Sequence, residues 1–214
     1  MQKISGRIAS SISEQLHYDE EKSAVIAYGL LAIMQVTVIM LYTVLFGVLT
    51  KTLLPALLIN LSGGVLRSFS GGAHAGSMAT CICISFAVIS AGAACSVYLL
   101  PAVPGFPAAV VLILLFSILF FIAFKYIPVD SPNKPIRRPE KIRRLRRQSF
   151  AMLAVLFAAC AAFLTVFMLT EDKGWYALFW ALLLAAAWQV WTLTLTGRKL
   201  LALLDALLGG KAES

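Results

Sequence analysis

The sequence predicts an all-α, polytopic membrane protein with six transmembrane helices, the second of them short, and an N-terminal amphipathic helix. The 214 residues are 60% hydrophobic and only 13% charged, and their mean hydropathy is +0.88. Soluble domains average about 45–50% apolar and about 25% charged residues, so a domain of this size could not cover so much apolar surface in water. A spanning helix needs roughly 20 apolar residues, and the chain holds about six such stretches.

The same composition excludes other classes of protein. Disordered chains, nucleic-acid-binding domains and small secreted domains stapled by disulfides are all far less apolar. The formal net charge is +8. In a membrane protein such an excess is first a signal of topology and only second a signal of binding, so no nucleic-acid partner is predicted.

The first element, residues 1–22, is predicted to be an amphipathic helix on the inner leaflet. Ile4, Ile8, Ile12 and Leu16 recur every four residues among Ser and Gln, which places them on one helical face. No uninterrupted apolar core follows Lys3, so the segment is not expected to be a signal peptide. The C-terminal tail, 197–214, has a similar apolar face formed by Leu200, Leu201, Leu204 and Leu208.

Between these ends lies the predicted membrane core, 24–196. Its six apolar stretches are 24–49, 53–66, 79–100, 107–127, 150–169 and 175–196. The second is short, since about 14 residues rise roughly 21 Å against a core of about 30 Å. It also carries Pro55, Asn60 and Gly63-Gly64. A thinned crossing and a re-entrant half-helix both fit this stretch, because irregular backbone is tolerated at depth beside protein.

Charge predicts the orientation and favours six crossings. The loop 128–149 is strongly basic and contains Lys134, Arg137, Arg138, Lys141, Arg143, Arg144, Arg146 and Arg147. The positive-inside rule places this loop and both termini in the cytoplasm. Of the 18 Lys and Arg, only Lys51 and Lys173 then lie outside. We expect a single membrane domain spanning 1–214.

Acidic residues are missing from the predicted spans, which narrows the possible chemistry. None occurs between Lys22 and Asp130, and the last two spans contain none. Proton-coupled transporters and aspartyl proteases of the membrane need buried carboxylates. The chain has two histidines and no His-Glu-x-x-His motif, so a zinc protease is not predicted.

The strongest candidate for catalysis is the stretch 67–81, which joins the second and third spans at the cytoplasmic face. It contains His74 and, seven residues later, Cys81. A thiolate is a nucleophile, and a nearby imidazole is a common means of forming it. On one continuous helix the two side chains would lie about 10.5 Å apart along the axis, beyond the roughly 3 Å that proton transfer needs.

The chain must therefore bend between these two residues if they act together. Gly76 permits a bend and Ser77 is a good N-cap. The third span would then begin near Met78 and hold Cys81 one turn inside, where the helix dipole favours an anion and burial in lipid opposes one. Backbone N–H groups around Gly71-Gly72 could approach a substrate carbonyl, as an oxyanion hole requires.

Structural roles explain the other thiols more simply. Cys83, Cys95 and Cys160 are expected to be small apolar residues within spans. A zinc site made from His74, Cys81 and Cys83 would lack a fourth ligand, so we predict neither a metal nor another cofactor.

Two motifs carry a family resemblance that covers nearly the whole chain. The first is Arg67-x4-Gly72-x-His74-x6-Cys81, and the second is Pro-Val-Asp-Ser-Pro-Asn-Lys-Pro-Ile at 128–136. The sequence resembles the accessory gene regulator B (AgrB) family of bacterial membrane cysteine endopeptidases in these motifs, in length, in span count, in its basic central loop and in its amphipathic N-terminus.

The resemblance implies a function at the bacterial cell membrane. Such enzymes remove the acidic C-terminal tail of a short precursor peptide and help to close a thiolactone or lactone ring, which yields a quorum-sensing autoinducer. It implies that Cys81 is the nucleophile and His74 its base, and that Arg67 and Gly72 match positions needed for activity. It also implies a homodimer.

Several roles stay open at the level of the sequence. Arg67 could hold a carboxylate of the precursor or cap the second span, and the basic loop could set topology and contact anionic lipids or attract the acidic tail. Asp130, Asn133, Asn60 or Ser70 could orient His74, or the pair could act without a third member. A non-enzymatic membrane transporter or scaffold is the competing class of function.

Overall fold

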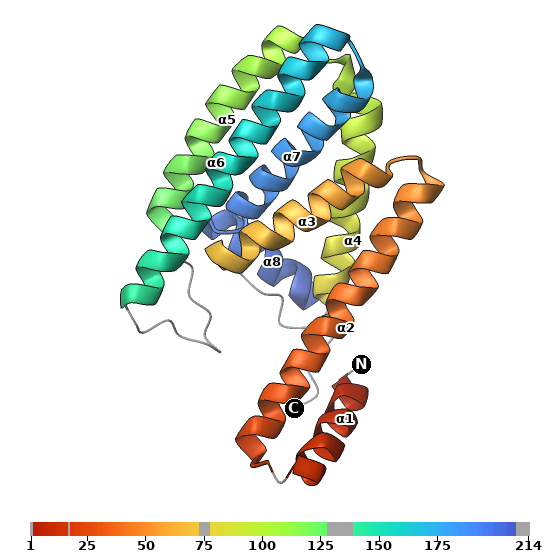
Figure 1. Cartoon of the computed structure of the whole chain (residues 1–214), viewed down its shortest axis with the longest axis vertical. Coiled ribbons are helices and arrows are strands. Elements are labelled where there is room, and N and C mark those ends of the chain that lie inside the picture. The colour runs from red at the N-terminus through yellow and green to blue at the C-terminus, as the bar shows by residue number, and fades with distance from the viewer. Residues whose placement is uncertain (1, 17, 73–77, 128–138, 209–214) are drawn as a thin grey trace. The chain divides into compact units, whose positions relative to one another are not determined.

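The computed structural model describes residues 2–16, 18–72, 78–127 and 139–208, and within these ranges the chain forms helices joined by short turns (Figure 1). They fall into two units, Met1–Tyr42 and Thr43–Ser214, whose boundary lies inside one helix.

Within the described residues, six helices are long and apolar enough to cross a membrane, which confirms the predicted fold class and indicates a multi-pass membrane protein. These segments are Lys22–Leu49, Leu53–Ser70, Met78–Ala102, Gly105–Tyr126, Pro139–Thr170 and Lys173–Trp191.

The first unit contains α1 (Gln2–Leu16) and most of α2 (Glu20–Leu49). In α1 the hydroxyl residues Ser5 and Ser13 are buried while Ile8 is exposed. Asp19 caps α2, because its carboxylate accepts a hydrogen bond of 2.9 Å from the backbone N–H of Lys22.

The second unit begins with the end of α2 and with α3 (Leu53–Ser70). This helix is four residues longer than the predicted stretch 53–66 and runs without a break through Gly63 and Gly64. Its 18 residues rise about 27 Å, close to the thickness of the hydrocarbon core, so a continuous short crossing fits better than a re-entrant turn.

The third span combines α4 (Met78–Ala94) with a π-helical segment, Cys95–Leu99, and a 3-10 turn, Leu100–Ala102. The described part of α4 begins at Met78, next to the segment 73–77 that lies outside the described residues. It crosses α3 closely at Gly92, where a Cβ atom would lie 2.9 Å from the Ile59 side chain.

Helix α7 (Lys173–Trp191) is the centre of the second unit and contacts α3, α4, α5 (Gly105–Tyr126) and α6 (Pro139–Thr170). Figure 1 shows α5, α6 and α7 side by side. Tyr176 and Phe179 on α7 are fully buried. The Tyr176 ring stacks on Phe167 and its hydroxyl donates to the Val103 carbonyl at 2.8 Å, so the polar tip is satisfied inside the apolar core.

Two predicted boundaries are wrong. Residues 139–149, expected in a loop, form the first turns of α6, because Pro139 suits a helix start and the following Lys, Arg and Leu residues favour helix. The last span ends at Trp191 instead of 196, and α8 (Leu195–Leu208) follows. The turn between them is so tight that a Cβ on Gly197 would meet the Trp191 carbonyl at 2.3 Å.

Candidate active site

Gly71 and the motif residue Gly72 form the turn that ends α3. Gly71 has φ 72° and ψ −151°, and Gly72 has φ 142°. Both conformations are ones that residues with a side chain rarely adopt, which explains why glycine occurs at both positions. The Gly71 N–H donates to the Arg67 carbonyl at 3.0 Å and so closes the last helical turn. Of the two N–H groups expected to face a substrate, that of Gly72 therefore remains the candidate.

A buried amide from α7 holds this turn. The Gln189 side chain is 3% exposed, and its Nε2 donates to Ser70 Oγ and to the Gly71 carbonyl, each at 3.1 Å. Ser70 Oγ also donates to the Gly71 carbonyl at 3.1 Å. Sequence reasoning missed Gln189, although a lone amide in an apolar span is a signal, since a buried polar group needs a partner.

Ser70 and Asn60 differ sharply as candidates for orienting His74. Ser70 is fully buried and bonded within the turn that leads toward residue 74. Asn60 lies ten residues earlier in α3, about 15 Å away along the axis. Its Nδ2 donates to Thr43 Oγ1 on α2 at 3.1 Å. The structure thus brings Ser70, and not Asn60, to the end of α3 that bears the motif.

Cys81 lies in the first turn of α4 and is half-buried. Its carbonyl accepts a hydrogen bond of 2.8 Å from Ser85 Oγ. Cys83 is exposed, Cys95 lies in the π-helical segment, and Cys160 is fully buried in α6. Among the four thiols, Cys81 is the one at the N-terminal end of an α-helix, where the dipole favours an anion.

Other predicted site residues lie outside the described residues. His74 belongs to the segment 73–77, together with the predicted bend at Gly76 and cap at Ser77. Asp130, Asn133, Lys134, Arg137 and Arg138 belong to 128–138. Arg67 is half-buried in the last turn of α3, where a cation stabilises the helix dipole.

The basic residues at the start of α6 do not behave alike. Arg143, Arg144 and Arg147 are exposed and line a hollow of about 320 Å³ with Glu140, and Lys141 is also exposed. Arg146 instead donates to the Phe124 carbonyl on α5 at 3.0 Å and stacks over the Phe124 ring. Arg146 therefore anchors α6 to α5, while the other cations are available to a ligand.

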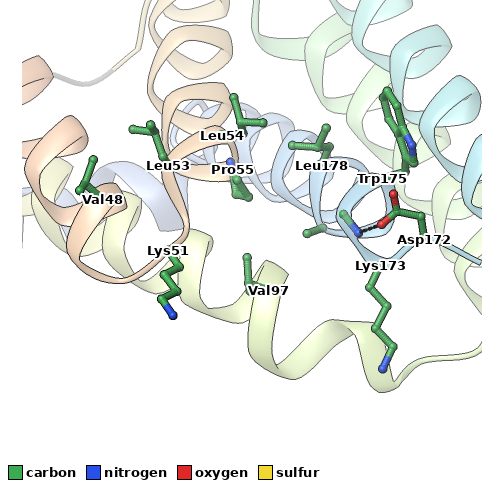
Figure 2. A pocket seen from close by; sticks show the side chains of 13 residues that line it. Val48, Lys51, Leu53, Leu54, Pro55, Val97, Asp172, Lys173, Trp175 and Leu178 are labelled. Carbon is green, nitrogen blue, oxygen red and sulfur yellow. Dashed lines mark hydrogen bonds between the residues drawn. The ribbon is translucent and has the colours of Figure 1, made fainter.

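A larger cavity of about 690 Å³ lies where α3 and α7 begin, and it contains none of the predicted site residues (Figure 2). Its lining residues are Gly47, Val48, Lys51, Leu53, Leu54, Pro55, Val97, Asp172, Lys173, Gly174, Trp175, Ala177 and Leu178. Figure 2 shows the Lys51 and Lys173 side chains extending to the same side. Among the described residues, no cluster of three His, Cys, Asp or Glu could hold a metal ion.

Comparisons with known proteins connect this geometry to a family. The model of the family described as "Accessory gene regulator B" matches residues 5–193. A protein of Clostridium perfringens (strain 13 / Type A) named "Putative AgrB-like protein 2" is 30% identical over 218 residues, which cover 96% of this chain and 97% of that protein.

A second relative, from Clostridium perfringens (strain SM101 / Type A), is named "Putative AgrB-like protein" and shows the same identity and coverage. No solved structure matches the chain. The residues matched by the family model include the C-terminal end of α3 and the N-terminal end of α4, which carry the motif. They also include nearly all of the membrane core. The chain belongs to the accessory gene regulator B (AgrB) family, and this membership supports a role in the agr quorum-sensing system.

Proposed function

We propose that this protein is an integral-membrane cysteine endopeptidase that cleaves a precursor peptide and promotes its cyclisation to a thiolactone or lactone autoinducer. The observation that carries the proposal is the position of Cys81 in the first turn of α4, directly after the segment that follows the glycine turn of α3. The N-terminal end of a helix favours a thiolate. In the Gly71–Gly72 turn, the Gly72 N–H is a candidate donor to a substrate carbonyl.

Cleavage follows from the chemistry of a His–Cys pair. His74 accepts the proton of Cys81, and the thiolate attacks the precursor carbonyl at the junction between the future ring and the tail. The Gly72 N–H donates to the oxyanion, an interaction worth about 2.7–4 kcal/mol in hydrolases. The C–N bond breaks, His74 protonates the leaving amine, and the ring portion stays bound to Cys81 as a thioester.

Cyclisation then needs no external energy source. A Cys or Ser of the precursor attacks the acyl-thioester, its own S–C or O–C bond forms, and the Cys81 thiol is regenerated. Because the thioester keeps the acyl group activated, the ring can close before hydrolysis if water is excluded. A site at the edge of the membrane suits that requirement.

The partners and the orientation belong to the same proposal. The site, both termini and the basic start of α6 face the cytoplasm of a bacterial cell, as the positive-inside rule requires. Arg143, Arg144 and Arg147 attract the acidic tail of the precursor, anionic lipids neutralise the remaining cations, and two chains form a homodimer.

Replacement of either member of the pair tests the proposal against a transporter or scaffold. We expect Cys81→Ala and His74→Ala to stop cleavage of a co-expressed acidic-tailed precursor, while the amount of membrane protein stays constant. Cys83→Ala is the matched control and is expected to cleave normally. Full cleavage by Cys81→Ala, or loss of cleavage in Cys83→Ala alone, would contradict the proposed nucleophile.

A further inference from the structure

Gln189 is unusual because it is a buried amide in an apolar helix whose hydrogen bonds reach a different helix. It is 3% exposed, and its Nε2 bonds residues 118 and 119 positions earlier in the chain. A buried donor without a partner is unfavourable, so these two bonds hold Ser70 and Gly71 against α7.

The atom that Gln189 holds determines the direction of a neighbouring group. The Gly71 carbonyl and the Gly72 N–H belong to one trans peptide unit and point in opposite directions. Because Gln189 Nε2 and Ser70 Oγ both donate to the Gly71 carbonyl, the carbonyl is fixed toward α7 and the Gly72 N–H is directed away from it. The Gly71 N–H is already bonded to Arg67.

The space around Gly72 also keeps this peptide in place. A Cβ at Gly72 would lie 3.6 Å from both Gln189 Nε2 and Thr192 Oγ1, so α7 packs at ordinary contact distance against the turn. Without the Gln189 donor, the Gly71–Gly72 peptide could rotate and present its carbonyl where the N–H now lies. An oxyanion would then face an oxygen in place of a donor.

We infer that Gln189 is a positioning residue that fixes the direction of the Gly72 N–H, the donor that the proposed function assigns to the oxyanion. The inference rests on the proposed function, in which Cys81 is acylated. It assigns α7 a role in the reaction although α7 supplies no reacting group.

Two small probes separate this role from a general structural role. p-Nitrophenyl acetate acylates a thiolate: the S–C bond forms, a tetrahedral oxyanion appears, and p-nitrophenolate leaves. Iodoacetamide alkylates the same thiolate with loss of iodide and without an oxyanion. The full-length protein in detergent is treated with each probe, and the rate of modification at Cys81 is measured by peptide mapping.

Gln189→Met keeps the length of the side chain and removes the donor. We expect acetylation of Cys81 to slow about tenfold, less than the roughly 10²–10³-fold cost of deleting an oxyanion-hole donor, while alkylation keeps its wild-type rate. Thr192→Val is the matched control, because Thr192, the residue that follows α7, is also buried and donates to the Gln189 carbonyl within the same turn. It should change neither rate. Equal changes in both rates for Gln189→Met, or no change, would overturn the inference.

A second variant guards against misfolding of the first. In Gln189→Glu the ionised carboxylate cannot donate to the Gly71 carbonyl, but the protonated carboxyl can. The ratio of acetylation to alkylation, which cancels the thiolate fraction, should be low at alkaline pH and recover as the pH falls. A ratio equal to wild type at every pH would overturn the inference. His74→Ala tests the proposed function separately from the role of Gln189. Undiminished rates with both probes in this variant would refute the proposed dyad of His74 and Cys81.

Discussion

Helices α3 and α7 run parallel, and their two ends are built differently. At the C-terminal ends, Gln189 crosses from one helix to the other and bonds the backbone of the glycine turn. At the N-terminal ends, the helices are separated by the cavity of about 690 Å³, and the cap of α7 bonds its own first turn. Asp172 accepts from the Gly174 N–H at 2.7 Å.

The comparison shows that unusual backbone geometry alone does not identify a site. Lys51 and Glu171, at the cavity end, both have φ 56°, but each simply ends a preceding helix, as the bond from Glu171 N–H to the Phe167 carbonyl shows. The positive φ values of Gly71 and Gly72 occur where a second helix fixes the direction of a peptide. The distinguishing feature is therefore the bonding of the backbone atoms.

The largest effect should come from Gly72→Ala. Its φ of 142° is strained for any residue with a side chain, at a cost of about 1–3 kcal/mol, and relief of that strain would rotate the N–H away. We expect precursor cleavage to fall about 100-fold, as expected for loss of an oxyanion donor, while folded protein is still recovered.

Gly64→Ala, inside α3, is the matched control. A Cβ there would meet nothing within 4 Å, and alanine favours a helix over glycine by about 0.5–1 kcal/mol. Cleavage should be unchanged and thermal stability slightly raised. If Gly64→Ala impaired cleavage as much as Gly72→Ala, the special role of the turn would be refuted.

An intermediate effect is expected at the start of α6. Because α6 and α7 are antiparallel neighbours joined by a short turn, the start of α6 lies toward the C-terminal end of α7, which carries Gln189. Each exposed ion pair contributes about 0.2–1 kcal/mol. Combined Arg143→Gln, Arg144→Gln and Arg147→Gln should therefore weaken capture of an acidic-tailed precursor about tenfold at low salt, and less at high salt. Binding of a fluorescent precursor to the purified protein measures this.

Arg146 lies in the same part of α6 as these arginines but contacts α5 and not the hollow. Arg146→Gln loses the bond to the Phe124 carbonyl and the stacking on its ring, so we expect about 1–2 kcal/mol lower stability and unchanged capture. Reduced capture in Arg146→Gln, with normal capture by the triple variant, would reverse the assignment of these arginines.

The smallest effect should occur at the cavity end. Asp172→Ala removes the cap of α7 and should lower stability by about 1 kcal/mol, with an unchanged rate of precursor cleavage per folded molecule. Asp172→Asn keeps an acceptor oxygen and should be nearly neutral. Thermal unfolding in detergent measures the first quantity, and a lower cleavage rate in Asp172→Ala would show that the two ends are coupled.

Composition and charge patterning were enough to predict the fold, because apolar runs of this length have few alternatives to membrane helices. Helix ends were harder to predict. The basic residues 139–149 look like a loop by hydropathy, yet α6 begins at Pro139. Its 32 residues rise about 48 Å, so the helix extends well beyond the apolar core.

In the site, too, some features could be predicted from the sequence and others could not. The motif named Gly72, and the need for an oxyanion hole drew attention to Gly71 and Gly72 together. Contacts between distant segments could not be predicted, because Gln189 lies more than a hundred residues from the turn that it bonds. The bond from the Gly71 N–H to the Arg67 carbonyl likewise depends on how far α3 continues.

Trapping of the covalent intermediate tests the central claim most directly. The protein is mixed with its precursor, quenched in acid before cyclisation is complete, digested and analysed by mass spectrometry. We predict that Cys81 carries the ring portion of the precursor without its acidic tail, and that the adduct is absent in Cys81→Ala. An adduct on Cys83, Cys95 or Cys160, or cleavage by the Cys81→Ala protein, would contradict the account.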